Sequence, residues 1–488
     1  MELPYNLDAA RYAGRPHPMA QLDASEAALA ARLGVDQAPY HPPAEKFYHS
    51  NYIMDGCVAA DLRTAYGYYR KSATQLLSFC DYQRADGFIT GVKHPPKRFT
   101  INPERLLSTS PFEGNDYTQT PIIAYSVLKL HDRASSRPPV SPAQAIDPDK
   151  FLAQIYPVVQ GYYDHLMEHR QVAEDDPRVF LLHPHEANRD SGPEYDEWKT
   201  EELQRQFGKL AASLLRRKPR RGEHMGSLFN KRNRAIDYAG ALAINLAGYK
   251  AGWKPERVHE NTEFIDVWFN YLLRENYLAM SELSSRVGRE EDADRYRQTA
   301  GRLGEAMLRH YLPEARGGKG AFYSIYNGKP QLRDTIGNLT PLLDGSLPAS
   351  QLHSLVTLIN EGFSPDYPLP SVATDNRDVY DPHYEEYDRH WRGPKWPVAD
   401  VIVMRGISRQ LSRDGVLLPA IRQELTGQLQ GIHESNLAVV DITGDYAEHH
   451  NPVTGIGQRM HRTRGHVFGA AAHTPIEYIR EDALPRAA

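Results

Sequence analysis

The strongest constraint on the fold is a helical spacing of apolar residues that recurs along most of the chain. It is clearest in residues 261–287, where Phe264, Val267, Trp268 and Leu272 fall on one stripe. Apolar residues at three- and four-residue steps lie on one face of an α-helix. The same spacing predicts further helices over 25–33, 56–83, 119–131, 148–170, 198–217, 234–252, 289–313, 349–361, 395–413, 415–434 and 467–480.

Strand signals are few and short, and residues 320–326 give the clearest one, as one arm of a small hairpin. Proline and glycine cluster between the predicted helices and not inside them. The helix pairs recur at roughly 40–60 residues, a spacing that a closed ring of helical hairpins would produce. The sequence therefore predicts an all-α fold whose functional residues lie on the loops at one end of the ring.

Composition excludes several kinds of partner. The chain has 488 residues, of which 41% are hydrophobic and 24% charged, as in an ordinary soluble protein with a large core. Its net charge of −5 gives no basic surface for a nucleic acid, and we interpret the basic run 216–221 as a solvated loop. The chain has no run of about 18 apolar residues, which is the length that a membrane-spanning helix needs. Residues 1–22 do not resemble a secretory signal, so we expect a cytoplasmic protein.

Four long segments without a helical pattern are rich in polar and aromatic residues, namely 84–118, 183–197, 363–394 and 441–466. Long loops of this kind are usually functional or disordered, and their many aromatic residues argue against disorder. Residues 363–390 could form a lid. The functional residues are therefore expected in these loops.

Two carboxylates in these loops are candidates for acid–base chemistry. Asp190 lies in the ionisable segment 183–196, and Glu448 begins the segment 448–455. Hydrolysis of a glycosidic bond needs one protonated carboxyl to protonate the leaving oxygen and one carboxylate to activate water. Spacing alone does not select this pair among 62 acidic residues, since Asp190 could cap a following helix and Glu448 could pair with His449 or His450.

Several motifs together resemble family 63 of the glycoside hydrolases, which includes mannosylglycerate and glucosylglycerate hydrolases and the processing α-glucosidase. Residues 189–196, Arg-Asp-Ser-Gly-Pro-Glu-Tyr-Asp, are similar to the family signature Gly-x-Asp-Asn-Ser-Pro-x-Trp-Asp. Residues 448–455 resemble its Glu-x-x-x-Pro-x-Thr-Gly motif, and residues 391–396 resemble Trp-Arg-Gly-Pro-x-Trp. The resemblance spans about residues 50–475 and implies an (α/α)6 barrel, a six-hairpin toroid, with short β-hairpins in its loops.

The resemblance implies roles for individual residues. It makes Asp190 the general acid and Glu448 the general base of an inverting glycosidase. Its other motifs, such as Thr-Gln-Thr-Pro at 118–121 and Asp-Val-Trp-Phe-Asn at 266–270, supply candidate sugar-binding residues. These candidates are Asp55, Gln119, Arg189, Tyr195, Asp266, Trp391, Arg392 and Trp396. Each also has a purely structural alternative, because an aspartate can stabilise a helix start and a tryptophan is more often a core residue.

The chain departs from the family pattern around the predicted sugar pocket. Ser191 and Gly192 replace Asn-Ser, Tyr195 replaces a tryptophan, Met54 occupies an aromatic position, and Asp400 falls near a usual asparagine. These changes bear on the substrate more than on the fold or the reaction. The substrate class implied is therefore broad: an α-linked glucoside or mannoside such as glucosylglycerate, mannosylglycerate or an α-gluco-oligosaccharide.

The implied mechanism makes geometric predictions. Inversion requires the two carboxyl groups to lie roughly 6.5–9.5 Å apart, with room for a water molecule. The pKa of Asp190 should be raised by burial or by a neighbouring carboxylate. Because a cation beside Asp190 would oppose that, the side chain of Arg189 is expected to turn away from the pocket.

No cofactor is predicted, because the chain has neither a Gly-x-Gly-x-x-Gly loop after a predicted strand nor a Walker-type loop. No metal is predicted either, because the loop histidines lack the helical spacing of a zinc site; they are His183, His185, His449 and His450. The expected partner is a small carbohydrate, bound by a monomer or a homo-oligomer. We divide the chain into an N-terminal arm (1–47), a catalytic domain (48–480) and a C-terminal tail (481–488).

Two alternatives remain open at the level of sequence. A polysaccharide lyase or a sugar epimerase on the same toroid would use histidine or tyrosine as its base, and the chain has 21 and 29 of these. A non-catalytic sugar-binding protein would bind glycans without turnover. The Glu448 motif argues against the first alternative, and the presence of both carboxylates argues against the second.

Overall fold

The computed structural model describes most of the chain. It covers residues 50–93, 115–189, 191–215, 239–260, 262–381, 391–413, 417–443 and 447–457, with 23, 26, 27, 30 and 31 before them. Asp190, the basic run 216–221, and the predicted helix 467–480 lie outside the described residues.

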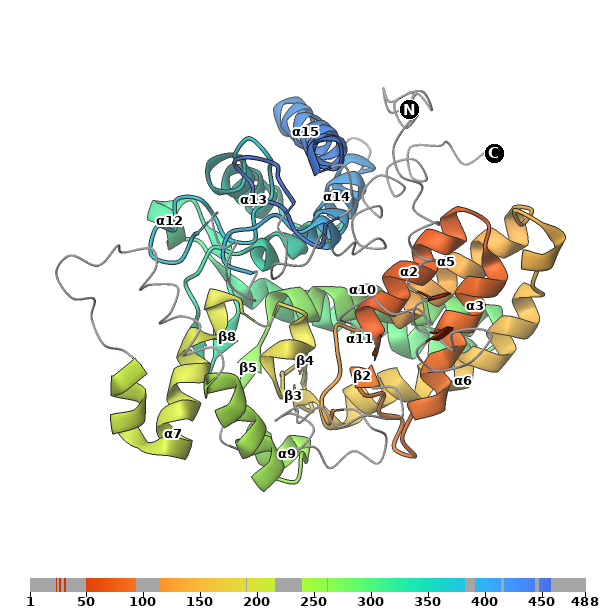
Figure 1. The fold of residues 1–488 in the computed structure, drawn as a ribbon, viewed down its shortest axis with the longest axis horizontal. Coiled ribbons are helices and arrows are strands. Elements are labelled where there is room, and N and C mark those ends of the chain that lie inside the picture. Colours follow the sequence, from red (N-terminus) through yellow and green to blue (C-terminus); the bar gives the residue numbers. More distant parts are fainter. Residues whose placement is uncertain are drawn as a thin grey trace.

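Long helices form most of the described structure (Figure 1). The α-helices are α2 (Ile53–Ala65), α3 (Tyr69–Leu77), α5 (Ile123–Ser136), α6 (Pro148–His169), α7 (Asp196–Leu215), α9 (Pro255–His259), α10 (Val267–Arg286), α11 (Glu290–Met307), α12 (Ala315–Gly318), α13 (Ala349–Gly362), α14 (Pro397–Leu411) and α15 (Pro419–Thr443). Short 3₁₀ helices are η2 (Ser78–Tyr82), η3 (Pro142–Gln144), η4 (Pro184–Ala187), η5 (Pro193–Tyr195), η6 (Leu308–His310) and η7 (Ile336–Leu343).

The strands are short, and all of them pair in antiparallel fashion. They are β1 (Asn51–Tyr52) with β2 (Val92–Lys93), β3 (Gln171–Ala173) with β4 (Asp176–Val179), β6 (Tyr311–Leu312) with β7 (Ala321–Phe322), and β8 (Ile325–Tyr326) between β5 (Phe264–Ile265) and β9 (Lys329–Pro330). The predicted strand at 320–326 is therefore present as two short strands. The all-α class is confirmed.

Helix α10 lies at the centre of the described structure and packs against α5, α6, α11 and η7 (Figure 1). Its apolar stripe is the one predicted from the sequence, and Trp268, Tyr271 and Tyr277 are fully buried. The side chain of Asp266 caps the helix by accepting a hydrogen bond from the backbone N–H of Phe269 at 2.8 Å. This cap fixes the start of α10.

The chain between 56 and 83, predicted as one helix, is a hairpin of two helices, α2 and α3. The break lies at Gly67, whose φ is +78°, a conformation that glycine adopts without strain. A Cβ atom there would also lie 2.8 Å from the backbone nitrogen of Val140. The prediction of a single helix was wrong because the apolar spacing continues across this turn.

Five helices begin within a few residues of a predicted site residue. Asp55 lies in the first turn of α2, Gln119 precedes α5, Asp190 precedes α7, Asp266 caps α10, and Trp396 precedes α14. The starts of helices thus gather the predicted site, as expected for loops at one end of a helical ring. None of the helices in the described ranges is both long and apolar enough to cross a membrane.

Candidate active site

The start of α2 and the segment before α5 are joined directly. The side-chain oxygen of Gln119 accepts a hydrogen bond from the backbone N–H of Met54 at 3.1 Å. The next residue is Asp55, which is half-buried as a whole while its carboxyl is desolvated, and in the described part of the chain that carboxyl forms no hydrogen bond with another side chain. Burial raises the pKa of Asp55 to about 7. A carboxyl group that is desolvated and unpaired in this way is typical of a functional site.

The same Gln119 segment is tied to the chain that leads to Asp190. The N–H of Thr118 donates to Glu186 Oε1 at 3.0 Å, and the N–H of Thr120 donates to Asn188 Oδ1 at 3.1 Å. Glu186 itself is fully buried and forms an ion pair with Arg170 at 2.7 Å. Gln119 therefore lies beside the residues that precede Asp190.

Asn188 makes the turn that leads into the Asp190 segment. Its φ of +55° is left-handed, a conformation that asparagine tolerates better than most residues. It stands where the family signature has glycine, which reaches the same conformation without a Cβ. This position could have been recognised from the sequence, because an asparagine at a glycine position is a sign of positive φ.

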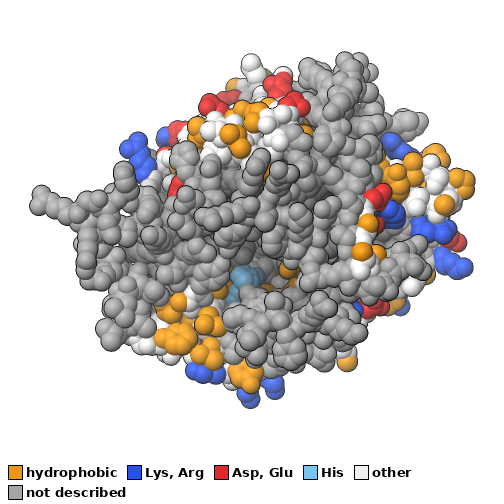
Figure 2. Space-filling model, viewed as in Figure 1, with side chains coloured by type: hydrophobic (Ala, Val, Ile, Leu, Met, Phe, Trp, Pro, Cys, Tyr) orange, Lys and Arg blue, Asp and Glu red, His pale blue; other side chains and the backbone are white. Residues whose placement is uncertain are grey.

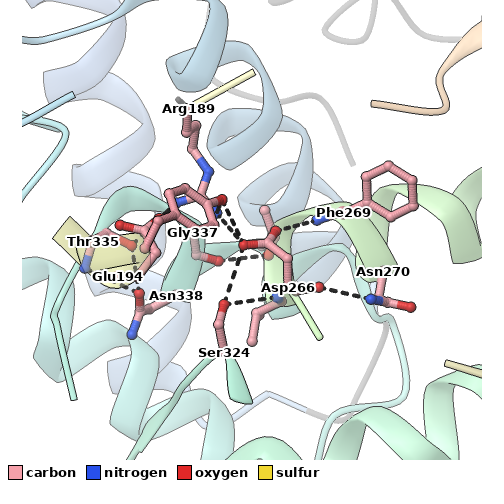
Figure 3. A network of polar contacts seen from close by, with 12 residues as sticks. Arg189, Glu194, Asp266, Phe269, Asn270, Ser324, Thr335, Gly337 and Asn338 are labelled. Atoms are coloured by element: carbon pink, nitrogen blue, oxygen red, sulfur yellow. Dashed lines mark hydrogen bonds and ion pairs between the residues drawn. The ribbon is translucent and has the colours of Figure 1, made fainter. Parts of the chain in front are cut away.

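Arg189 and the residues after Asp190 form a buried polar network (Figure 3). The guanidinium of Arg189 pairs with the carboxylates of Glu194 and Asp266, the latter at 2.9 Å. It also donates to the hydroxyls of Tyr195 at 3.2 Å and Thr335 at 3.3 Å. Tyr195 in turn donates to Asp266 at 2.8 Å. A direct sugar contact by Arg189, Tyr195 or Asp266 stays a prediction, since in the structure these side chains bind one another.

Segment 391–396 carries a stacked tryptophan pair. The rings of Trp391 and Trp396 have centroids 4.2 Å apart and planes within 5°, and both side chains are almost fully buried. The N–H of Trp391 donates to the hydroxyl of Ser191 at 3.1 Å, so the segment contacts the residue after Asp190. Arg392 is buried and pairs with Asp196 at 3.1 Å, at the start of α7.

The Glu448 loop attaches to the other end of the same segment. Lys395 and His450 exchange two backbone hydrogen bonds of 2.8 and 2.9 Å, and the ring of His449 lies 5.0 Å from that of Trp396. Burial and the neighbouring Lys395 charge lower the pKa of His450 to about 3, so its ring is neutral at working pH. Glu448 is partly exposed.

The structure therefore brings most of the predicted site together. Hydrogen bonds join the residues around Asp55, Gln119 and Asp190, and segment 391–396 links the Asp190 and Glu448 loops. The carboxyl of Asp190 lies outside the described residues, so its distance from Glu448 and its pKa stay predictions. Residues 382–390 of the predicted lid also lie outside the described residues.

The buried pair formed by Lys395 and Asp400 was not predicted. Both side chains are fully buried, and the Lys395 ammonium also donates to the carbonyl of Pro368 at 2.8 Å. Burial raises the pKa of Asp400 to about 6 and lowers that of Lys395. The only available sequence signal was the aspartate at a position where the family usually has asparagine. The pair fixes the segment on which the tryptophans and the Glu448 loop rest.

The loop histidines pack against aromatic and polar groups. His183 stacks on Tyr117 with centroids 4.5 Å apart, and His185 Nδ1 lies 3.2 Å from the Tyr117 hydroxyl. Within the described residues, no three His, Cys, Asp or Glu side chains are grouped in a way that could hold a metal ion. The face in Figure 2 is hollowed near its centre, and a histidine side chain is visible there.

A separate groove of about 670 Å³ lies between α13 and α15. Tyr367, Asn360, Gln428 and Ser435 are among its lining residues. Its lining contains none of the predicted site residues, although the N–H of Tyr367 donates to the carbonyl of Pro452 at 2.9 Å, in the loop that carries Glu448. The predicted site residues are thus distinct from the residues that line this groove.

Comparison with solved structures identifies the fold of most of the chain. It is similar to the family 63 mannosylglycerate hydrolase from Thermus thermophilus in complex with glucose, at 19% identity and a TM-score of 0.69, covering 95% of this chain and 98% of that one. The same enzyme in complex with Tris and D-glycerate matches at 18% identity and a TM-score of 0.68, covering 94% and 100%. Neutral trehalase from Saccharomyces cerevisiae matches at 13% and 0.53, covering 91% and 74%. No curated protein sequence matches significantly.

The fold is thus the (α/α)6 toroid of six-hairpin glycosidases. The similar solved structures are glycoside hydrolases of this fold, and the two predicted carboxylates lie in the segment before α7 and in the loop after α15. Residues 64–469 match the mannosylglycerate hydrolase MGH1-like glycoside hydrolase domain, and the protein belongs to this family. The family relationship predicted from the sequence motifs is confirmed.

Proposed function

We propose that this glycosidase hydrolyses an α-linked glucoside or mannoside with inversion, using Asp190 as general acid and Glu448 as general base. The observation that carries the proposal is the attachment of both loops to one segment. Ser191 binds Trp391, and His449 and His450 contact Trp396 and Lys395. An inverting enzyme needs two carboxyl groups held at a fixed spacing on either side of the sugar, and one rigid segment between their loops supports that.

In the proposed reaction, Asp190 gives its proton to the glycosidic oxygen as the bond to the anomeric carbon breaks. Glu448 takes a proton from a water molecule, whose oxygen bonds to the anomeric carbon from the opposite face. Asp55 would accept hydrogen bonds from sugar hydroxyls, and Trp391 or Trp396 would form an apolar wall. The low pKa of His450 keeps its ring neutral, so this imidazole adds no positive charge beside Glu448 that would weaken a base.

The proposed aglycone is small and anionic, as in glucosylglycerate or mannosylglycerate. The similar Thermus thermophilus structure contains D-glycerate, which supports this choice. The helix starts around the site support it as well, because the N-terminal end of a helix carries a partial positive charge that favours carboxylates. An α-gluco-oligosaccharide such as kojibiose or nigerose is the neutral alternative.

Turnover with stereochemistry tests the proposal. The purified protein is given glucosylglycerate, mannosylglycerate, kojibiose and nigerose, and the first-formed anomer is followed by proton NMR. We expect β-anomer release from one α-linked substrate. Asp190→Asn and Glu448→Gln should each lower kcat by about 100-fold or more. Asp294→Asn and Glu305→Gln, at exposed positions of α11, are the matched controls.

Three results would contradict the proposal. Release of the α-anomer would indicate retention, and activity of the Asp190 and Glu448 variants equal to that of the controls would remove both assignments. Binding of the sugars without any turnover would instead favour a sugar-binding protein.

A further inference from the structure

Asp190 is flanked by two side chains that pair with each other in the protein interior. Arg189 precedes it, Glu194 follows four residues later, and their side chains are about 2% and 3% exposed. The backbone N–H of Gly192 donates to the carbonyl of Arg189 at 2.8 Å, and the N–H of Tyr195 donates to that of Gly192 at 3.2 Å. The ion pair therefore joins the residue before Asp190 to the residue four positions after it.

The pair is anchored to elements far away in the sequence (Figure 3). Asp266, the cap of α10, binds the other guanidinium nitrogen of Arg189, and the Trp268 ring lies 5.3 Å from the guanidinium carbon. Thr335, just before η7, receives a further hydrogen bond. Ser324 donates to the same Asp266 oxygen at 3.3 Å. The ion pair is thus held to the start of α10 and to the segments that carry Ser324 and Thr335.

Two glycines leave no space for the pair to move. A Cβ at Gly192 would lie 2.5 Å from Glu194 Oε2, and a Cβ at Gly337 would lie 2.6 Å from Arg189 Nη1. Both distances are well inside van der Waals contact. The carboxylate and the guanidinium each fit against a backbone that only glycine provides.

Stability alone does not account for such a network. Desolvation of one guanidinium and two carboxylates can exceed their mutual attraction, and apolar side chains of similar size often give equal stability. Burial raises the pKa of Glu194, with a further contribution from Asp266 that Arg189 opposes. Arg189 and Glu194 also occupy the two open positions of the family signature, so the motif itself does not require them. Fixing one geometry is the best-attested use of a buried ionic group.

We infer that Arg189 and Glu194, braced by Asp266, form a positioning clamp that orients Asp190 toward the glycosidic oxygen. This inference rests on the proposed function, in which Asp190 is the general acid. The clamp residues would not touch the substrate. They would act by fixing the chain on one side of Asp190, while the hydrogen bond between Ser191 and Trp391 fixes it on the other.

The leaving group of the substrate provides the test. A glycosyl fluoride leaves without protonation, so its hydrolysis depends little on a general acid. A glycoside of an aliphatic alcohol needs the acid, which contributes about 100- to 10,000-fold. A misplaced Asp190 should therefore slow the alcohol glycoside and spare the fluoride. A general loss of structure should slow both equally.

The clamp variants are Glu194→Gln, Arg189→Lys and Gly337→Ala. Glu194→Gln keeps the shape of the side chain and removes its charge. Arg189→Lys keeps the charge and removes the planar guanidinium that binds two carboxylates at once. Gly337→Ala places a methyl group against the guanidinium of Arg189. The matched control is Glu275→Gln, because Glu275 is buried in the middle of α10 and pairs with Arg405 at 3.1 Å and with Arg409. It lies nine residues beyond Asp266, about 13 Å along the helix.

We expect each clamp variant to lower kcat for the alcohol glycoside by about 10- to 100-fold, with less than about 3-fold loss on the fluoride. Glu275→Gln should leave the ratio of the two rates at the wild-type value, whatever its effect on thermal stability. Equal losses on both substrates, or a ratio like that of Glu275→Gln, would overturn the clamp.

The test separates failure of the clamp from failure of the proposed function. Wild type that hydrolyses neither substrate would refute the proposed function, and the clamp with it. Asp190→Asn that slows both substrates equally would remove the general-acid assignment on which the clamp depends. If Asp190→Asn is selective for the alcohol glycoside and the clamp variants are not, only the clamp is wrong.

Discussion

Replacing Asp55 by asparagine should stabilise the protein at alkaline pH while it weakens substrate turnover. Burial raises the pKa of this carboxyl from the ordinary 3.8 to about 7. The folded protein therefore favours the neutral carboxyl, and above pH 7 the ionised carboxylate lowers the free energy of unfolding. A tenfold change in an acid constant corresponds to about 1.4 kcal/mol, so the full cost is at most about 4 kcal/mol. Solvent screening at this partly exposed side chain reduces it to about 1–2 kcal/mol.

The sign of the pH dependence follows from the raised pKa. The cost is absent below pH 3.8, grows between pH 3.8 and about 7, and is constant above that. Asp55→Asn, which cannot ionise, should thus raise the thermal midpoint more at pH 8 than at pH 5, by roughly 2 °C or less at this chain length. The same variant should lower kcat/KM by about 10- to 100-fold, because a charged hydrogen bond to a sugar hydroxyl is lost.

The assay is differential scanning fluorimetry at pH 5 and pH 8, beside turnover of the preferred substrate. Asp81→Asn, at an exposed position of η2, is the control and should give no gain that depends on pH. A midpoint that falls at pH 8, or a gain that is equal at the two pH values, would refute the assignment of a buried carboxyl at the start of α2. Unchanged turnover would refute its role in sugar binding.

Three further predictions concern the segments that support the site. Lys395→Met should lower the free energy of unfolding, measured in urea, by about 3–5 kcal/mol, because it leaves Asp400 buried without its cationic partner. The double variant Lys395→Met with Asp400→Leu should recover most of this loss. Equal losses in the two variants would show that the loss does not come from breaking the ion pair. Trp391→Ala should cost about 3–5 kcal/mol and Trp391→Phe distinctly less, since the ring is 5% exposed and stacked. Asn188→Val should be less stable than Asn188→Gly by about 1–2 kcal/mol, because valine resists the positive φ; a smaller gap would indicate that the turn rearranges.

The sequence was sufficient for the fold class and for most of the helices. Apolar spacing identifies helices such as α10, and family motifs mark the loops before their first turns. The spacing did not reveal the break at Gly67, because it continues through a turn that is defined by the distant Val140. The spacing of apolar residues along the chain does not indicate contacts between residues that are far apart in the sequence.

The partners of the site residues were equally beyond sequence reasoning. Arg189 was a candidate for sugar binding, but in the structure it binds Asp266 and Thr335, which lie 77 and 146 residues away. Lys395 and Asp400 are five residues apart, a spacing that matches neither a helix face nor a strand face. Which polar groups meet depends on how the ring of helices closes, and that is a tertiary property.

Segment 391–396 has a consequence for the motion of the site and for its evolution. Because the Asp190 and Glu448 loops are both bound to these six residues, a bend of the toroid should carry the two loops together and change their spacing little. In the proposed mechanism, the segment would then be a spacer of fixed length between acid and base. An insertion or deletion inside it should disturb the stereochemical outcome of the reaction, whereas changes in length on either side should alter substrate choice.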